Sequence, residues 1–281
     1  MTHQPGAPAG AASGVLGEMR AALRLPFTPA PLARLAEVEG YLPFVWPQIA
    51  ASVATAGFLG SARYMADMAL DAVEAVYEPE LSRATILDAG LSLRDVEDLG
   101  STIDLFHYTQ PQLLLVLAAL AEAFDHVEVG GQGRPDPRDL TDRERGHLAL
   151  PVRLASPEAP PLPEVAGALG ADAPPDLYRA VAAWPGYLQV AWEELQHLGA
   201  YPDFRRRGRA LYFYARSGAR FLAQPVRANP DALRAAGLSE AAIEAARQTL
   251  DAALPAMATM MMHAEAMRVG LGDRTREVVT G

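Results

Sequence analysis

A carboxylate that follows two prolines is the first group in this chain whose type and position suit catalysis. Asp176 comes directly after Pro174 and Pro175 and before a helical pattern. In an apolar pocket, desolvation would raise the pKa of this carboxyl toward the range of a general base, whereas a nearby helix N-terminus would favour the anion. An aspartate after Pro-Pro is also a good helix N-cap. From the residues alone, a base and a cap both remain open.

A second polar stretch, residues 106–111, precedes the most apolar segment of the chain. It reads Phe-His-Tyr-Thr-Gln-Pro and leads into a helix expected over Leu113–Ala121. We expect Pro111 at the start of that helix, because proline is favoured at the first helical position. Gln110 would then present its amide to a pocket. His107 is interpreted equally well as a pocket residue or as a hydrogen-bonded interior histidine.

Other kinds of chemistry find little support in the residues. Glu194 and His197 have the Glu-x-x-His spacing of di-iron bundles, but the positions related to them by the repeat described below hold Gln48 and Ala51. We therefore interpret the pair as a solvated helix face and predict no metal site. The chain has no cysteine, and all 24 basic residues are arginine. Thiol chemistry and Schiff-base lysines are thereby excluded.

Charge and hydropathy indicate a soluble protein. The formal net charge of −10 opposes a general nucleic-acid-binding surface. The longest apolar run, Leu113–Ala121, is well short of the roughly 20 residues of a membrane span. Residues 1–17 are rich in glycine, alanine and proline and lack a signal-peptide pattern. We expect a cytoplasmic protein that binds neither nucleic acid nor membranes.

The rest of the pattern is helical almost throughout. Alanine, leucine, arginine and glutamate dominate, and no segment alternates as a strand does. The predicted fold class is all-α. Helices are expected over residues 32–41, 61–77, 113–124, 178–184, 187–198, 204–221, 239–250 and 256–269, with a short one near 162–169.

An internal repeat organises these helices. Gly-Tyr-Leu at 40–42, followed by Trp46, recurs at 186–188, followed by Trp192, at an offset of 146 residues. Ala-Gly-Leu-Ser at 89–92 recurs at 236–239, at an offset of 147. We expect both tryptophans in the core, and Ser92 and Ser239 as N-caps that follow a helix-ending glycine. The sequence predicts two homologous helical repeats that form a pseudo-dimer.

The repeat sets the predicted boundaries along the chain. They are a flexible N-terminal tail at 1–15, repeat 1 at 16–125, a Pro-rich crossover linker at 126–161, repeat 2 at 162–270 and a C-terminal tail at 271–281. Because each repeat can contribute different groups, the ligand pocket is expected at their junction. The chain could also form a homodimer.

Four motifs support a family resemblance. They are Leu-Arg-Leu-Pro-Phe at 23–27, Gly-Tyr-Leu-Pro-x-x-Trp at 40–46, Phe-x-Tyr-x-x-Pro-x-Leu-Leu-Leu at 106–115 and Ala-x-Trp-Pro at 182–185. With these motifs and the two-repeat layout, nearly the whole chain resembles the group I 2-haloacid dehalogenases, which act on both D- and L-enantiomers. The resemblance implies a hydrolase in which an aspartate activates a water molecule. The water replaces halide at C2 of a short 2-halocarboxylate with inversion, without a covalent ester, a metal or an organic cofactor.

The resemblance also implies roles for individual residues. The general base is Asp176, and the amide that holds water or substrate is Gln110. The predicted substrate-binding residues are Phe27, Ala30 and Leu177, together with His107 and Tyr108 of the polar stretch. The chain departs from the family pattern in three ways. The family's aspartate aligns with Leu177 unless the alignment slips by one residue, Gln110 stands where the family has asparagine, and Ala30 stands where it has an aromatic residue.

The alternative function belongs to another class of protein. If Leu177 marks a lost catalytic aspartate, the chain is a catalytically degenerate helical pseudo-dimer that binds a small apolar carboxylic acid. Release of halide from a 2-halocarboxylate separates the enzyme from the binding protein.

Overall fold

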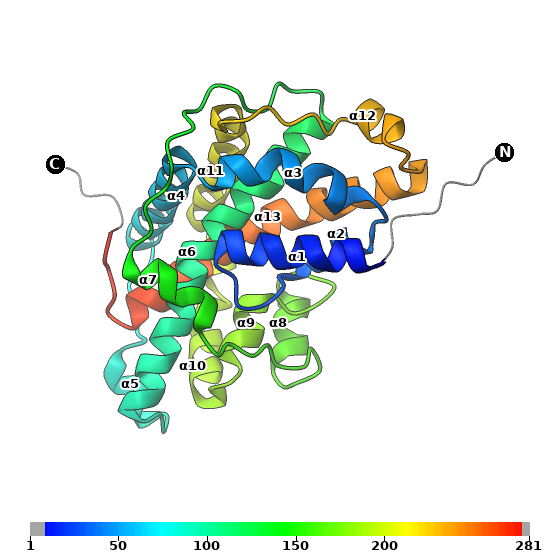
Figure 1. The fold of residues 1–281 in the computed structure, drawn as a ribbon. Coiled ribbons are helices and arrows are strands. Elements are labelled where there is room, and N and C mark those ends of the chain that lie inside the picture. Colours follow the sequence, from blue (N-terminus) through cyan, green and yellow to red (C-terminus); the bar gives the residue numbers. More distant parts are fainter. Residues whose placement is uncertain (1–8, 277–281) are drawn as a thin grey trace. The chain divides into compact units, whose positions relative to one another are not determined.

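The computed structural model describes residues 9–276, which are mostly helical and contain no β-strand (Figure 1). An isolated bridge between Thr55 and Pro137 is the only strand-like pairing in this part of the chain. The predicted all-α fold class is confirmed. The α-helices are α1 (Ala9–Leu23), α2 (Ala30–Glu37), α3 (Tyr41–Val53), α4 (Ala56–Glu74), α5 (Arg83–Asp88), α6 (Leu93–Phe124), α7 (Asp142–Gly146), α8 (Leu162–Ala168), α9 (Asp176–Val181), α10 (Pro185–Leu195), α11 (Pro202–Gly218), α12 (Pro230–Ala235) and α13 (Glu240–Gly270).

The helices recur in the same order in the two halves of the sequence. α2 and α9 begin 146 residues apart, as do α4 and α11. α5 and α12 begin 147 residues apart, as do α6 and α13. The starts of these four helix pairs therefore repeat with the two offsets that relate the sequence motifs.

Corresponding glycine and serine residues end one helix and begin the next in both repeats. Gly90 and Gly237, which follow α5 and α12, both have φ +93°, the left-handed conformation that ends many helices. Ser92 Oγ then accepts a hydrogen bond from the backbone N–H of Asp95, and Ser239 Oγ accepts one from Ala242, each at 3.2 Å. Both serines cap the following helix, as predicted.

Contacts within the chain divide it into two compact units, and these units differ from the repeats. Unit 1 consists of residues 1–62, 112–149 and 212–256. Unit 2 consists of residues 63–111, 150–211 and 257–281. Each unit thus combines early helices of one repeat with late helices of the other, and α4, α6, α11 and α13 contribute residues to both.

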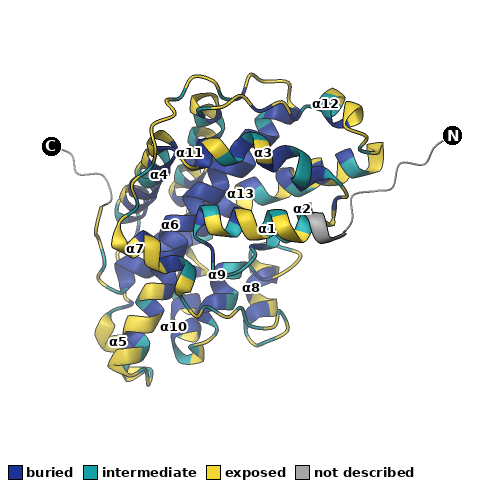
Figure 2. Cartoon of the chain, in the orientation of Figure 1, coloured by how far each residue is buried: buried dark blue, intermediate teal, exposed yellow. Residues whose placement is uncertain are grey.

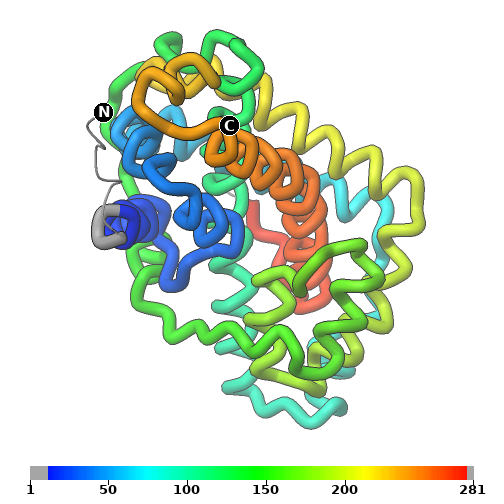
Figure 3. Tube along the Cα trace, turned by 90° about the vertical axis from the view of Figure 1, so that its right-hand side faces the viewer, coloured from blue at the N-terminus to red at the C-terminus, as the bar shows by residue number. Residues whose placement is uncertain are grey.

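In unit 1, α1, α2 and α3 pack together, as the blue segments of Figures 1 and 3 show. Trp46 of α3 donates its indole N–H to Glu18 of α1 at 3.2 Å. Gly40, the N-cap of α3, lies beside Leu238, whose Cδ1 is 3.7 Å from the place that a Cβ on Gly40 would occupy. A helix of repeat 1 therefore packs on the turn between α12 and α13 of repeat 2.

Unit 2 contains the same contacts between repeat-related residues. Trp192 of α10 donates its indole N–H to Glu164 of α8 at 3.4 Å. Gly186 of α10 lies beside the turn that follows α5, where a Cβ on this glycine would be 3.6 Å from Leu91 Cδ1. Both Trp46 and Trp192 are buried, as predicted for core residues.

Two long helices continue through prolines at which we expected helix breaks. α6 contains Pro111 and α13 contains Pro255, so neither the expected helix start at residue 111 nor the division of 239–269 into two helices is correct. An internal proline removes one backbone hydrogen bond and disturbs the carbonyl four residues earlier. Here buried residues lie beside both prolines: Gln110 and Gln112 on either side of Pro111, and Leu254 before Pro255. Their packing maintains the helical path, whereas local propensity alone predicts a break.

The ends of the chain and the crossover also differ from expectation. α1 begins at Ala9, so residues 9–15, expected in the flexible tail, are helical. Residues 1–8 and 277–281 of the two predicted tails lie outside the described residues. The crossover contains α7, which begins with a capping box between Thr141 and Glu144. The short helix expected near 162–169 is confirmed as α8.

The segment Leu113–Ala121 of α6 is buried along its whole length (Figure 2). It belongs to unit 1. Among the described residues, no helix combines the length and the apolar character that a membrane span requires.

Candidate active site

Asp176 is the first residue of α9, in unit 2. The N-cap is Pro175, whose extended backbone leads into the helix and whose carbonyl accepts a hydrogen bond from the Arg179 N–H at 3.1 Å. The interpretation of Asp176 as the N-cap is therefore wrong, because the helix begins one residue earlier than that interpretation requires. No side-chain capping bond forms at this helix start.

The Asp176 carboxylate is largely withdrawn from water. Its side chain is 11% exposed, and Oδ1 lies 3.4 Å from Nη1 of Arg179 in the next turn. The Arg179 Nε donates to the carbonyl of Ala155 at 2.9 Å, and the Ala155 N–H donates back to the Arg179 carbonyl at 3.0 Å. These bonds attach the first turn of α9 to the crossover segment, and the helix N-terminus favours an anion at Asp176.

The next two residues of α9 point into the core of unit 2. Leu177, with which the family's aspartate aligns, is 1% exposed. Tyr178 is fully buried, and its hydroxyl lies 2.6 Å from Nδ1 of His263 on α13. The Tyr178 ring also packs edge-on against Trp192, with 5.5 Å between ring centroids. Among the first three residues of α9, Asp176 is therefore the one that carries a carboxylate, and it is also the least buried of the three.

Gln110 lies in the unit 2 part of α6 and is 6% exposed. Its side-chain Oε1 is buried and has no hydrogen-bond partner among the described residues. A buried carbonyl oxygen without a partner costs roughly 1–3 kcal/mol, so such an atom in a native protein calls for a physical explanation. Oε1 can accept a hydrogen bond from a water molecule or from a substrate.

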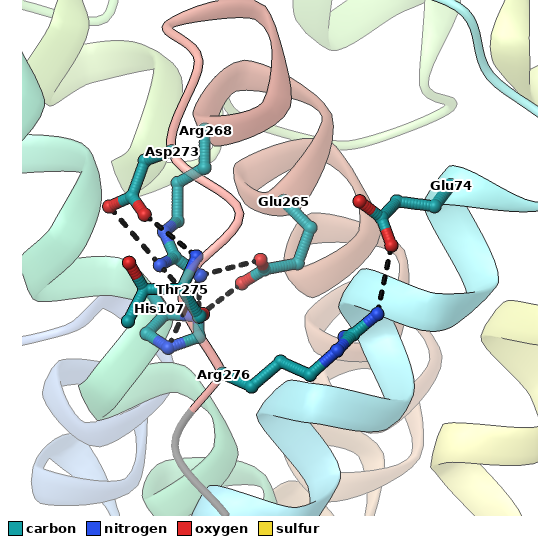
Figure 4. Close-up of polar contacts among 7 residues, drawn as sticks. All are labelled: Glu74, His107, Glu265, Arg268, Asp273, Thr275 and Arg276. Carbon is teal, nitrogen blue, oxygen red and sulfur yellow. Dashed lines mark hydrogen bonds and ion pairs between the residues drawn. The ribbon is translucent and has the colours of Figure 1, made fainter.

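His107, one helical turn before Gln110, is held by two residues of α13 (Figure 4). Its Nδ1 lies 2.5 Å from Glu265 Oε1, while Arg268 Nη1 donates to Glu265 Oε2 at 2.9 Å. Each of the three residues is 2% exposed. The same Nδ1 lies 2.7 Å from Arg268 Nη1, so this ring nitrogen contacts both a hydrogen-bond acceptor and a donor. The contacts fit the interior interpretation of His107, and its contact with substrate remains a prediction.

Arg268 connects this cluster to the last described residues. Its Nη2 lies 3.2 Å from Asp273 Oδ2 and donates to the Thr275 carbonyl at 3.3 Å (Figure 4). Burial opposes the charge of Arg268, but Glu265, Asp273 and Asp104 raise its pKa above the usual value. Burial likewise opposes ionisation of Asp273, but the Thr275 N–H and Arg268 lower its pKa to about 2. Arg268 and Asp273 are therefore both charged at neutral pH.

The remaining predicted residues are divided between the units. Tyr108 is buried in unit 2, with its ring edge-on to His107 at 5.0 Å between centroids. Phe27 lies between α1 and α2, and Ala30 is the first residue of α2, both in unit 1. Unit 2 therefore contains Asp176, Leu177, Gln110, His107 and Tyr108, while Phe27 and Ala30 belong to unit 1.

Glu194 has a structural role that sequence reasoning did not anticipate. Its carboxylate accepts hydrogen bonds from the Tyr77 hydroxyl at 2.6 Å and from the N–H groups of Glu80 and Leu81 at 2.8 and 2.9 Å. The interpretation of this residue as part of a solvated face is wrong, because the carboxylate closes the turn between α4 and α5. His197 is exposed, and the described residues contain no cluster of three potential metal ligands.

Comparison with known proteins relates the chain to dehalogenases. A "2-haloacid dehalogenase, configuration-inverting" from Pseudomonas sp. (strain 113) is 27% identical over 202 residues, which are 65% of this chain and 63% of the relative. The match thus spans less than two thirds of the relative's length. No family model matches the sequence.

The solved structures give a more extensive match. A D-2-haloacid dehalogenase mutant in complex with D-2-CPA has a TM-score of 0.83 with this chain, at 18% identity and with 95% of both chains covered. A mutant D-2-haloacid dehalogenase has a TM-score of 0.84, and a complex with L-LA has one of 0.82, with the same identity and coverage. This chain has the fold of these D-2-haloacid dehalogenases.

Within this fold, several polar residues that sequence reasoning missed lie in buried positions of unit 2. The helical periodicity of the sequence does not distinguish these residues from the apolar residues of a buried helix face. Comparison of the two repeats does distinguish them. Each stands where the other repeat has a buried apolar residue at an offset of 147. The pairs are His263 with Val116, Glu265 with Ala118, and Arg268 with Ala121.

Proposed function

We propose that this chain is a hydrolytic dehalogenase that acts at C2 of short 2-halocarboxylates. The observation that carries the proposal is the Asp176 carboxylate, which is 11% exposed in the first turn of α9 and lies 3.4 Å from the Arg179 guanidinium. The similarity to the configuration-inverting 2-haloacid dehalogenase and the fold of the D-2-haloacid dehalogenases support this activity.

In the proposed reaction, Asp176 is the general base. Its carboxylate takes a proton from a water molecule, and the water oxygen attacks C2 on the side opposite the carbon–halogen bond. The electron pair of that bond leaves with the halide, which gives the 2-hydroxycarboxylate of inverted configuration. The proton then passes from Asp176 to solvent. The proposed reaction forms no ester with the protein and uses no metal or organic cofactor.

Gln110 supports this mechanism as an acceptor for the attacking water. A 2-halocarboxylate anion has no N–H or O–H group, so the buried Oε1, which has no partner among the described residues, gains its hydrogen bond from the water. The extra methylene of glutamine relative to asparagine moves this oxygen further from the α6 backbone. We retain Phe27, Ala30, Leu177, Tyr108 and His107 as predicted substrate-binding residues.

Free-halide release from both enantiomers of 2-chloro- and 2-bromopropanoate tests the activity. We expect Asp176→Asn to lower kcat by roughly 10²–10⁴-fold, the contribution of a general base. The free energy of unfolding should change little, because asparagine has nearly the same size as aspartate and keeps one side-chain oxygen. Asp172→Asn is the matched control, since Asp172 is an exposed carboxylate in the loop that precedes α9, and it should keep the parent rate.

A single turnover in H₂¹⁸O tests the direct attack of water. The heavy oxygen should enter the product in the first turnover, whereas an ester intermediate would transfer an oxygen of the protein. An active parent whose Asp176→Asn variant keeps the same rate would refute Asp176 as the base. A parent that binds these acids without releasing halide would instead support the alternative, a degenerate binding protein.

A further inference from the structure

Tyr178 and His263 form a buried polar pair that unit 1 replaces with apolar residues. The Tyr178 oxygen lies 2.6 Å from His263 Nδ1, and the two residues are 0% and 1% exposed. At the offsets of the repeat, the corresponding residues are Leu32 of α2 and Val116 of α6, both fully buried in unit 1. The repeat therefore shows that this helix pattern accepts apolar residues at both positions.

The proton arrangement of the pair leaves a polar group unsatisfied. Burial lowers the pKa of His263 to about 4 and raises that of Tyr178 well above its usual value, so both groups are neutral at pH 7. His263 Nε2 is buried and has no hydrogen-bond partner among the described residues. Donation from Tyr178 to Nδ1 leaves only the Nε2–H group unpaired, whereas the reverse leaves both Nε2 and the hydroxyl proton unpaired. An unpaired buried N–H destabilises the folded state, so stability alone does not explain the pair.

The short helix α9 needs contacts outside itself to fix its position. It has only six residues, too few for a stable isolated helix. Leu177, Ala180 and Val181 bury its apolar face, but apolar contacts have no directional requirement. The hydrogen bond from Tyr178 to α13 depends on both distance and angle, so it restricts rotation of α9 about its axis. Asp176 lies two residues before Tyr178 in the same turn, and such a rotation would move its carboxylate.

We propose that Tyr178 and His263 are positioning residues, which hold α9 at the rotation in which the Asp176 carboxylate acts as base. The proposal rests on the proposed function, because it requires Asp176 to take part in the reaction. A displacement of about 1 Å at a reacting group can lower the rate by about 10²-fold. Loss of the hydrogen bond should therefore lower kcat and leave KM nearly unchanged, because neither residue binds substrate.

The test is Tyr178→Phe, which removes the hydroxyl and keeps the ring. We expect kcat for halide release to fall by about 10- to 10²-fold, while KM changes by less than about twofold. Tyr187→Phe is the matched control, because Tyr187 is fully buried in unit 2 and its hydroxyl has no partner among the described residues. This variant loses the same atom without losing a hydrogen bond and should keep the parent kcat.

Variants of His263 test the pair from its other side. His263→Asn places a side-chain oxygen near the position of Nδ1 and should retain most of kcat. His263→Val introduces the residue that stands at the related position of the other repeat, Val116. Valine offers no hydrogen-bond acceptor, so this variant should lower kcat as far as Tyr178→Phe does. If Tyr178→Phe fails to fold, this comparison decides, and equal rates for the two His263 variants would overturn the proposal.

A double variant separates positioning of the base from general structural damage. In an Asp176→Asn background, Tyr178→Phe should have no further effect on kcat, because the group it positions is gone. If Tyr178→Phe lowers kcat by the same factor in both backgrounds, or leaves the parent kcat unchanged, the positioning role is overturned and the proposed function stands. A parent that releases no halide, or one whose rate Asp176→Asn does not change, overturns the proposed function and the positioning role with it.

Discussion

Burial of His263 against Tyr178 and Phe204 makes the stability of this protein depend on pH. The His263 ring centroid lies 5.9 Å from that of Tyr178 and 5.6 Å from that of Phe204, and desolvation lowers the pKa of the imidazole to about 4. In the unfolded chain the same group titrates near pH 6.5. Between these values the unfolded state binds a proton that the native state does not, so stability falls as the pH falls through this window.

We therefore predict that His263→Val reduces the loss of stability in acid. Between neutral pH and about pH 4, the free energy of unfolding of the parent should fall by on the order of 3 kcal/mol more than that of the variant. Urea unfolding at a series of pH values measures both curves, and titrations shared by the two proteins cancel in the difference. Curves that stay parallel across this range would show that His263 is not buried as a neutral imidazole.

At the scale of elements, two repeat-related glycines serve different physical needs. Gly40 has φ +78° at the N-cap of α3, where a Cβ would meet nothing closer than 3.7 Å. Gly186 lies within α10, where a Cβ would be 2.8 Å from the Ala89 carbonyl oxygen, closer than van der Waals contact allows. The first glycine is required by backbone conformation and the second by a close approach of backbone.

Asparagine should therefore destabilise the protein less than alanine does at Gly40, but more than alanine does at Gly186. Gly40→Ala should cost about 1–2 kcal/mol for the left-handed conformation, and Gly40→Asn should cost less, because asparagine tolerates that region. Gly186→Ala should cost roughly 1–3 kcal/mol through overpacking, and Gly186→Asn more. Urea unfolding of the four variants checks this order. A Gly186→Asn variant more stable than Gly186→Ala would contradict the close-contact explanation.

The elements also show which parts of the fold could be predicted from sequence. The all-α fold class was predictable from composition, and the repeat was predictable from the spacing of its motifs. The caps at Ser92 and Ser239 were predictable from their neighbouring residues. The continuity of α6 through Pro111 was not, because packing on both sides of the proline overrides local propensity. In the candidate site, the sequence indicated Asp176 and Gln110. It did not indicate Tyr178 or His263, since a polar residue on a buried helix face resembles its apolar neighbours in periodicity.

For the whole molecule, the division of segments between the units determines where the chain can be cut. Unit 1 joins residues 1–62 and 112–149 with residues 212–256, and unit 2 joins residues 63–111 with 150–211 and 257–281. A cut between Ala149 and Leu150 separates the two repeats but removes segments from both units. Neither half retains a complete set of buried contacts, such as that between Gly40 and Leu238 in unit 1.

We predict that fragments 1–149 and 150–281 do not unfold cooperatively when isolated, and that mixing them restores a cooperative transition. Circular dichroism during thermal unfolding measures this for each fragment and for the mixture. The control is the full chain folded first and then cut at an inserted protease site between the same residues, which should remain folded. Cooperative unfolding of either fragment alone at the melting temperature of the full chain would show that a single repeat folds independently.

The same division of segments affects the chain while it is being synthesised. Helices α1, α2 and α3 leave the ribosome early, but unit 1 also needs residues as late as Ala256. Between residues 62 and 256, translation at typical rates takes ~10–40 s. During that time Leu32, Leu42 and Trp46, buried in the finished protein, lack part of the unit that covers them. Folding of unit 1 is therefore completed near the end of translation, and until then the nascent chain exposes apolar helix faces that the finished protein buries.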